Sequence, residues 1–163
     1  MSIYWLEQIQ SDGCLLVGEK AFALSQLLQR GHAVVPGFVI GAPVLREFLK
    51  AIAGSNPLLA DFPDSPVRVD VDNYKTLQRA AQQVRQQVID ATLPAQWRSP
   101  PISAARQLNS PALILRSSVS LPDSLRGRFA GLLPSQVCWC EPEALSLALK
   151  QAWAELFRAR SLF

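Results

Sequence analysis

Two short motifs in the sequence have residue types that could bind an anion. The first is Val17-Gly18-Glu19-Lys20-Ala21, in which a glycine and a lysine stand at the start of a predicted helix. Backbone N–H groups and the helix dipole favour an anion at such a position, and a lysine ammonium adds a point charge suited to phosphate. The segment lacks the Gly-x-x-x-x-Gly-Lys-Ser/Thr pattern of a P-loop, so a solvated lysine is the alternative interpretation.

The second motif is Arg116-Ser117-Ser118, which follows the apolar run Ala112–Leu115. A guanidinium at the end of a strand can make forked hydrogen bonds to phosphate oxygens, and the two hydroxyls can donate as well. A structural arginine paired with a nearby carboxylate is the alternative. If both motifs belong to one core, the lysine and the arginine form a two-sided cradle for a polyphosphate.

Apolar spacing predicts the helices that must position these motifs. Apolar residues recur at intervals of three and four. Gly31 follows the first predicted helix, and Pro43 stands in the first turn of the second. Asp70 or Asp72 can cap the third, and Glu141-Pro142-Glu143 opens the last. The predicted helices cover residues 18–30, 43–52, 74–88, 94–108 and 142–156.

Short β-branched and aromatic runs predict the strands. These are the run after the Pro-Gly turn in Val34–Ile40, the run Ala112–Leu115, and the segment around Val137 and Trp139. We expect Ala112–Leu115 to be buried. Val137 and Trp139 alternate with Gln136 and Cys138, which predicts that the first pair faces the core. Polar residues with Gly and Pro predict loops over residues 54–66 and 121–131.

Composition limits the class of protein. The 163 residues are 49% hydrophobic and 18% charged, and 16 Lys+Arg against 13 Asp+Glu give a net charge of +3. This predicts one globular domain over residues 1–163. A charge of +3 without a dense basic stripe disfavours nucleic acid. No long apolar run or signal peptide stands in the sequence, which predicts no membrane association and a cytoplasmic location.

The cysteines and the single histidine predict no metal site and no catalytic residue. Cys14, Cys138 and Cys140 are an odd set without the paired spacings of a zinc site, so they are expected to be reduced packing residues. His32 follows Gly31 at the exit of the first predicted helix, where a surface or loop position is expected.

The motifs, taken in order, resemble the N-terminal ATP-binding region of phosphoenolpyruvate synthase and pyruvate phosphate dikinase. The similarity extends from about Ile3 to Phe163. It is carried by the two anion motifs and three others: Val35-Pro36-Gly37-Phe38-Val39-Ile40, Phe129-Ala130-Gly131 and Ala152-Trp153-Ala154-Glu155-Leu156-Phe157.

The resemblance implies the α/β (α+β) first lobe of an ATP-grasp-like nucleotide-binding domain, with a short central sheet flanked by helices. It assigns ATP phosphate contacts to Lys20 and Arg116, with Ser117 and Ser118 as lesser contacts. The implied reaction converts ATP, pyruvate and water to AMP, phosphoenolpyruvate and phosphate, with Mg²⁺ neutralising the phosphate oxygens. Related dikinases phosphorylate a glucan or an antibiotic instead.

The resemblance also implies partners, because the family's second lobe, which carries the Mg²⁺ ligands, and its phosphohistidine and pyruvate domains are not in these 163 residues. We expect these domains in the same or another chain, no turnover by this chain alone, and possible homo-oligomers through exposed apolar surface.

The chain departs from the family at Glu19 and Ala21, where the family has glycines, and at Leu132. These departures leave an alternative, a free-standing degenerate lobe with a nucleotide-binding or regulatory interaction role.

Overall fold

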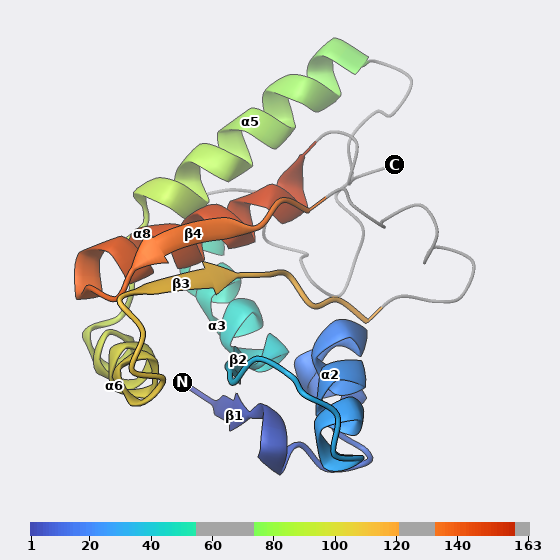
Figure 1. Cartoon of the computed structure of the whole chain (residues 1–163). Helices are drawn as coiled ribbons and strands as arrows, with labels where there is room; N and C mark the ends of the chain where they lie inside the picture. Colours follow the sequence, from blue (N-terminus) through green and yellow to red (C-terminus); the bar gives the residue numbers. More distant parts are fainter. Residues whose placement is uncertain (55–73, 121–132, 159–163) are drawn as a thin grey trace.

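The computed structural model describes residues 1–54, 74–120 and 133–158, and it is a mixed α and β arrangement with helices and two small sheets (Figure 1). The N-terminal part holds β1 (Ile3–Trp5), η1 (Leu6–Gln8), α1 (Cys14–Val17), α2 (Glu19–Gln29), β2 (Phe38–Ile40) and α3 (Ala42–Ala53). The rest holds α5 (Tyr74–Asp90), η2 (Ala95–Trp97), α6 (Ser99–Gln107), β3 (Ala112–Leu115), β4 (Gln136–Trp139), α8 (Pro142–Ala154) and η3 (Glu155–Phe157).

The structure confirms the longer helices that the apolar spacing predicts. Gly31 follows α2 with φ +84°, a conformation that glycine adopts at low cost, and Pro43 and Pro142 stand in the first turns of α3 and α8. The segment after Pro94 divides into η2 and α6, because Pro100 fits the first turn of a new helix. The predicted loop beyond Gly54, the loop 121–131 and the caps Asp70 and Asp72 lie outside the described residues.

The strands form two separate antiparallel pairs, which differs from the single central sheet expected. β1 pairs with β2, and β3 pairs with β4 so that Ile114 lies opposite Val137 and Ala112 opposite Trp139. Residue types can identify a strand, but they do not say which other strand pairs with it. β1 was not predicted because its three residues are too few to show an alternating pattern.

The largest core cluster lies between α3, α5 and α8. Phe48 of α3 and Trp153 of α8 pack with ring centroids 5.0 Å apart, and both side chains are almost fully buried. Val84 and Val88 of α5 complete the contact from the third helix. The apolar stripes predicted for these helices therefore meet one another in the core.

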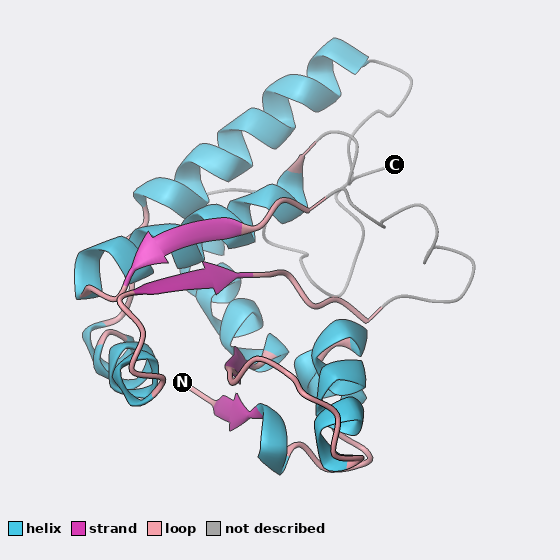
Figure 2. Cartoon of the chain, in the orientation of Figure 1, coloured by secondary structure: helices cyan, strands magenta, loops and turns pink. Residues whose placement is uncertain are grey.

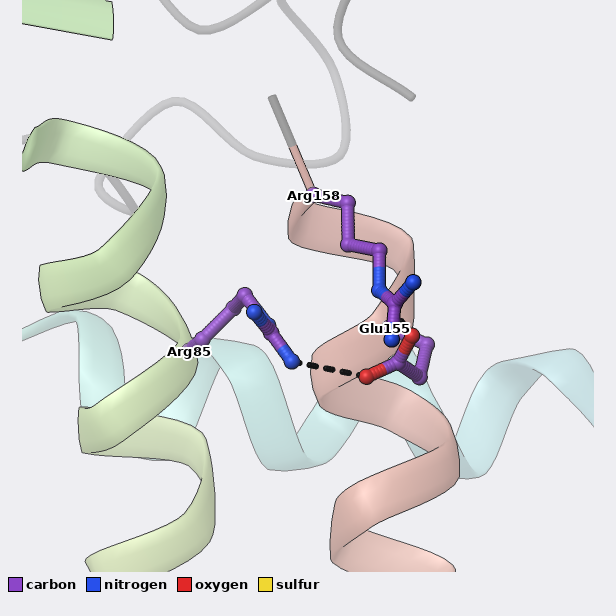
Figure 3. A network of polar contacts seen from close by, with 3 residues as sticks. All are labelled: Arg85, Glu155 and Arg158. Carbon is purple, nitrogen blue, oxygen red and sulfur yellow. Dashed lines mark hydrogen bonds and ion pairs between the residues drawn. The ribbon is translucent and has the colours of Figure 1, made fainter. Parts of the chain in front are cut away.

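Two polar contacts hold α5 against α8 and η3. Arg85 of α5 pairs with the buried carboxylate of Glu155 at 2.7 Å, and Arg158 contacts the same carboxylate from the other side (Figure 3). Lys150 of α8 donates hydrogen bonds to the carbonyls of Ile89 and Ala91, at 2.5 Å and 3.0 Å, where α5 ends. A cation at these carbonyls satisfies acceptors that no helical N–H reaches.

The second core cluster corrects the predicted orientation of β3 and β4. Cys138 is buried against Ile102 of α6 and Leu145 of α8, whereas Val137 and Trp139 are 72% and 65% exposed. The prediction that Val137 and Trp139 face the core is wrong, because cysteine is itself a small apolar residue and the alternation does not say which set is inside.

The prediction that Ala112–Leu115 is buried is also wrong, because Ile114 is 66% exposed. Ile114 lies on the same outward face as Val137, opposite it in the register. Leu113 and Leu115 point the other way and pack against the Cys138 cluster. The strand is therefore covered on one face only by described residues.

Of the predicted run Val34–Ile40, only Phe38–Ile40 forms a strand, and Val35 is exposed. The cysteines Cys14, Cys138 and Cys140 are free thiols, and burial together with the neighbouring Cys140 raises the pKa of Cys138. His32 is exposed just after α2. Across residues 1–54, 74–120 and 133–158, no helix is both long and apolar enough to span a bilayer.

Candidate phosphate-binding site

The two anion motifs meet where the chain leaving β3 reaches the first turn of α2. Figure 2 shows the loop after β3 running across to α2, although the two segments are almost one hundred positions apart in the sequence. Arg116 directly follows the last residue of β3, and Lys20 lies in the first turn of α2. The fold thus brings a strand end and a helix start together at one place.

Gly18 permits this close approach. Its φ is +79°, in the left-handed region that favours glycine, and a Cβ placed there would stand 2.3 Å from the carbonyl oxygen of Ser118. Any side chain at this position would push the chain after β3 away from α2. The glycine before Lys20 is therefore needed for backbone packing.

Hydrogen bonds from the first turn of α2 fix the segment after β3. The N–H of Glu19 donates to the carbonyl of Val119 at 3.1 Å, and the N–H of Ala21 donates to the hydroxyl oxygen of Ser118 at 3.0 Å. These bonds satisfy helix N–H groups that have no partner within the helix. We expected such N–H groups to face an anion, but these two are already occupied by protein acceptors. An anion here would be bound mainly by side chains.

Lys20 and Arg116 place two positive charges beside each other. The ammonium of Lys20 donates to the carbonyl of Ser117 at 3.0 Å, and the side chain remains exposed at the surface. Although the residue as a whole is exposed, partial desolvation of the ammonium lowers the pKa of Lys20, and the positive charge of Arg116 lowers it further. An anion between the two cations would relieve this repulsion. Two neighbouring cations are the kind of arrangement that favours an anion such as phosphate.

All four residues predicted for phosphate binding lie in this one region. Ser118 accepts a hydrogen bond from α2 and still has its own hydroxyl proton to donate, whereas Ser117 takes part through its backbone carbonyl. The alternative of an arginine paired with a carboxylate finds no support among the described residues, whose ion pairs do not include Arg116. The hydrogen bond that the Val119 carbonyl accepts could not be predicted from the sequence, because every residue type has the same backbone carbonyl.

Comparison with known proteins shows the family of the chain. The sequence model of the family described as "Pyruvate phosphate dikinase, AMP/ATP-binding domain" matches residues 14–163, a range that includes both Lys20 and Arg116. The chain belongs to this family. The resemblance inferred from the motifs is thereby confirmed, and the site lies within a domain whose family description names AMP and ATP.

Relatives of this dikinase ATP-binding domain align over nearly all of the chain. Phosphoenolpyruvate synthase of Aeropyrum pernix is 27% identical over 98% of the chain, and that of Pyrococcus furiosus is 25% identical over 99%. A probable phosphoenolpyruvate synthase of Staphylothermus marinus is 25% identical over 99%. The chain spans 20%, 24% and 20% of the lengths of these three relatives, so it corresponds to one part of much longer proteins.

Proposed function

We propose that this domain binds ATP and forms the ATP-binding part of a phosphoenolpyruvate synthase-like dikinase. The observation that carries the proposal is the pairing of Lys20 with Arg116 at the junction of α2 and the chain after β3. Two adjacent cations held by backbone contacts suit the triphosphate of a nucleotide, which carries several negative charges. ATP is the nucleotide we propose, because the description of the family names AMP and ATP.

The residues of the site would act by positioning and charge compensation. In phosphoryl transfer the protein mainly orients the phosphates and stabilises their charge, and it forms few covalent bonds itself. Lys20 would turn one or more of its N–H groups from the Ser117 carbonyl to a phosphate oxygen. Arg116 would make forked hydrogen bonds to the same group, and the Ser118 hydroxyl would add a donor. The close packing of Gly18 against Ser118 would keep the backbones that carry the two cations next to each other.

The full reaction belongs to the proposal as well. With phosphoenolpyruvate synthases among its relatives, the domain would serve the conversion of ATP, pyruvate and water to AMP, phosphoenolpyruvate and phosphate. The other lobe of an ATP-grasp-like domain and the domains that accept the phosphoryl group would lie in the same or another chain. A glucan or an antibiotic is the alternative acceptor.

Magnesium is assigned to those further parts. Among the described residues no three His, Cys, Asp or Glu side chains lie close enough together to hold a metal ion. Lys20, Arg116, Ser117 and Ser118 suit phosphate oxygens, and the positive charges of Lys20 and Arg116 would oppose a Mg²⁺ ion bound directly beside them.

Titration calorimetry with Mg-ATP tests the proposal on the chain itself. One wall of a nucleotide site is expected to bind weakly, with a Kd of about 1 mM. Lys20→Met and Arg116→Gln should each weaken binding at least about ten-fold, as the loss of a charged hydrogen bond does. The control Lys50→Met, which removes an exposed lysine of α3, should leave the affinity unchanged. Equal affinities for all four proteins would reject the site.

A further inference from the structure

Two thiols lie together where β4 ends. Cys138 is the third residue of β4 and Cys140 follows its last residue, so the alternation of an extended chain sets both side chains on one face. Cys138 is 9% exposed and packs against Ile102 and Leu145, and Cys140 is half-buried against the same cluster. Burial, and then the nearby thiol of Cys140, raise the pKa of Cys138, so the two thiols are electrostatic neighbours.

A hollow at the surface opens onto Cys140. It has a volume of about 390 Å³ and is lined by Arg106, Asn109, Ser110, Pro111 and Cys140. Figure 1 shows the chain passing from α6 into β3 at the end of the sheet where β4 ends, and the hollow lies at this turn. A water molecule occupies about 30 Å³ of liquid, so an ion that still carries water or a small ligand can reach the Cys140 sulfur from solvent.

We propose that Cys138 and Cys140 form a two-sulfur site for a soft monovalent metal ion of the Cu(I) class. Thiolate sulfur suits such an ion, and two thiolates alone can hold it, whereas zinc in structural sites takes four ligands. Residues 1–54, 74–120 and 133–158 bring no three His, Cys, Asp or Glu side chains together, which disfavours zinc. The proposal is independent of ATP binding, because Cys140 and Arg116 lie at opposite ends of β3.

Binding would exchange two protons for the ion. Each thiol gives its proton to water and each sulfur forms one bond to the metal, so no electron is transferred. Two thiolates and one monovalent cation leave one negative charge in excess. Arg106 lines the hollow together with Cys140, and the ion pairs found among the described residues do not engage its guanidinium. Arg106 would therefore compensate this charge and favour the ion-bound form.

The spacing of the two cysteines favours an ion over a disulfide. Each residue advances an extended chain by about 3.3 Å, which sets the α-carbons of Cys138 and Cys140 about 6.6 Å apart. Disulfides usually join α-carbons that are about 5.5–6 Å apart. An ion between the sulfurs adds two metal–sulfur bonds, each about 2.3 Å long for zinc, and so spans the wider gap.

Anaerobic titration with Cu(I) against the competing chelator bicinchoninate tests the site. The wild-type chain should take one Cu(I) ion, and native mass spectrometry should show one bound ion with the loss of two thiol protons. Cys140→Ser should lose the ion at chelator concentrations that the wild type withstands, because a hydroxyl is not a soft ligand. Cys138→Ala should do the same while keeping an apolar side chain in the core. Arg106→Gln should weaken binding about ten-fold, as the loss of a supporting group does.

Cys14→Ser is the matched control, because Cys14 is the third cysteine of the chain and lies apart in α1. It should keep one ion with unchanged affinity. Urea unfolding without metal checks that each variant folds, and Cys140→Ser, at the half-buried position, decides the question if Cys138→Ala unfolds. A wild-type chain that takes no ion, an ion lost equally from Cys14→Ser, or one ion shared by two chains would overturn the proposal.

Discussion

Gly18 lies so close to Ser118 that a methyl group on its α-carbon would stand 2.3 Å from the Ser118 carbonyl oxygen. This contact joins the start of α2 to the chain that leaves β3, and the Ala21 N–H bond to the Ser118 hydroxyl lies beside it. This backbone packing sets the first turn of α2, which carries Lys20, against the segment that begins with Arg116. The glycine beside the lysine is therefore part of the site although it offers no side chain.

Gly18→Ala should destabilise the chain by about 2 kcal/mol or more, because the change adds a steric clash to an unfavourable φ. Gly31→Ala separates the two causes, since Gly31 has φ +84° but no atom within 4 Å of an added Cβ. That control should cost about 1 kcal/mol. Urea unfolding measures both free energies, and equal losses in the two variants would show that the contact with Ser118 is not tight.

Lys20 should lose its proton at a pH below the value of an ordinary lysine, about 10.4, because partial burial and the charge of Arg116 both oppose its positive form. Nitrogen-detected titration of the ammonium measures this pKa. Arg116→Gln removes the second cause and should raise the pKa of Lys20. An unchanged pKa in Arg116→Gln would mean that the two cations do not interact.

The lowered pKa of Lys20 also sets a pH dependence of stability. The folded chain holds this proton less tightly than the unfolded chain does, so the unfolded state binds more protons between the two pKa values. The contribution of Lys20 to the free energy of unfolding therefore rises as the pH increases from the folded pKa to the unfolded one. In Lys20→Met this part of the pH profile should be missing.

Lys150→Met should cost about 1.5–3 kcal/mol of the free energy of unfolding, because the carbonyls of Ile89 and Ala91 lose their cationic donor. Methionine keeps the apolar stem, so the loss reports the hydrogen bonds and not the packing. Lys50→Met removes an exposed lysine and should change the free energy of unfolding by less than about 0.5 kcal/mol. Similar midpoints of urea unfolding for both variants would contradict the role given to Lys150.

Glu155→Gln should destabilise the contact between α5 and η3. The change keeps the shape of the side chain but leaves the guanidinium groups of Arg85 and Arg158 without their shared counter-charge. Solvent screens part of the effect, since the two arginine side chains are 34% and 31% exposed, so the expected loss is about 1–3 kcal/mol. A loss in 50 mM salt that shrinks in 1 M salt would bear this out, whereas a variant as stable as the wild type would contradict it.

The sequence was sufficient to predict the longer helices, and the assignment of the site residues to phosphate stays a prediction. Helix periodicity and the caps Gly31, Pro43 and Pro142 are local signals, and α2, α3 and α8 begin and end where these signals predict. Lys20 and Arg116 could be proposed as a pair because each stands at the end of a predicted element. Lys20 follows a glycine at the start of a helix, and Arg116 follows the apolar run of a strand. The structure then brings them together.

The pairing and the orientation of the strands could not be predicted in the same way. Strand pairing depends on which edges meet in space, and the sequence of β2 does not say that β1 is its partner. The inward face of β4 is decided by the packing of α6 and α8 on Cys138, a contact between distant segments. The hydrogen bonds from Glu19 and Ala21 to the chain after β3 could not be predicted either, because their donors are backbone N–H groups that nearly every residue type has.

The pKa of Lys20 in the presence of tripolyphosphate tests the central claim most directly. A phosphate held between Lys20 and Arg116 brings negative charge to the ammonium, and an opposite charge nearby favours the protonated form. We predict that saturating tripolyphosphate raises the pKa of Lys20 above its value in the free chain, with a smaller rise in Arg116→Gln. Tripolyphosphate that binds the chain and leaves the pKa of Lys20 unchanged would contradict the account.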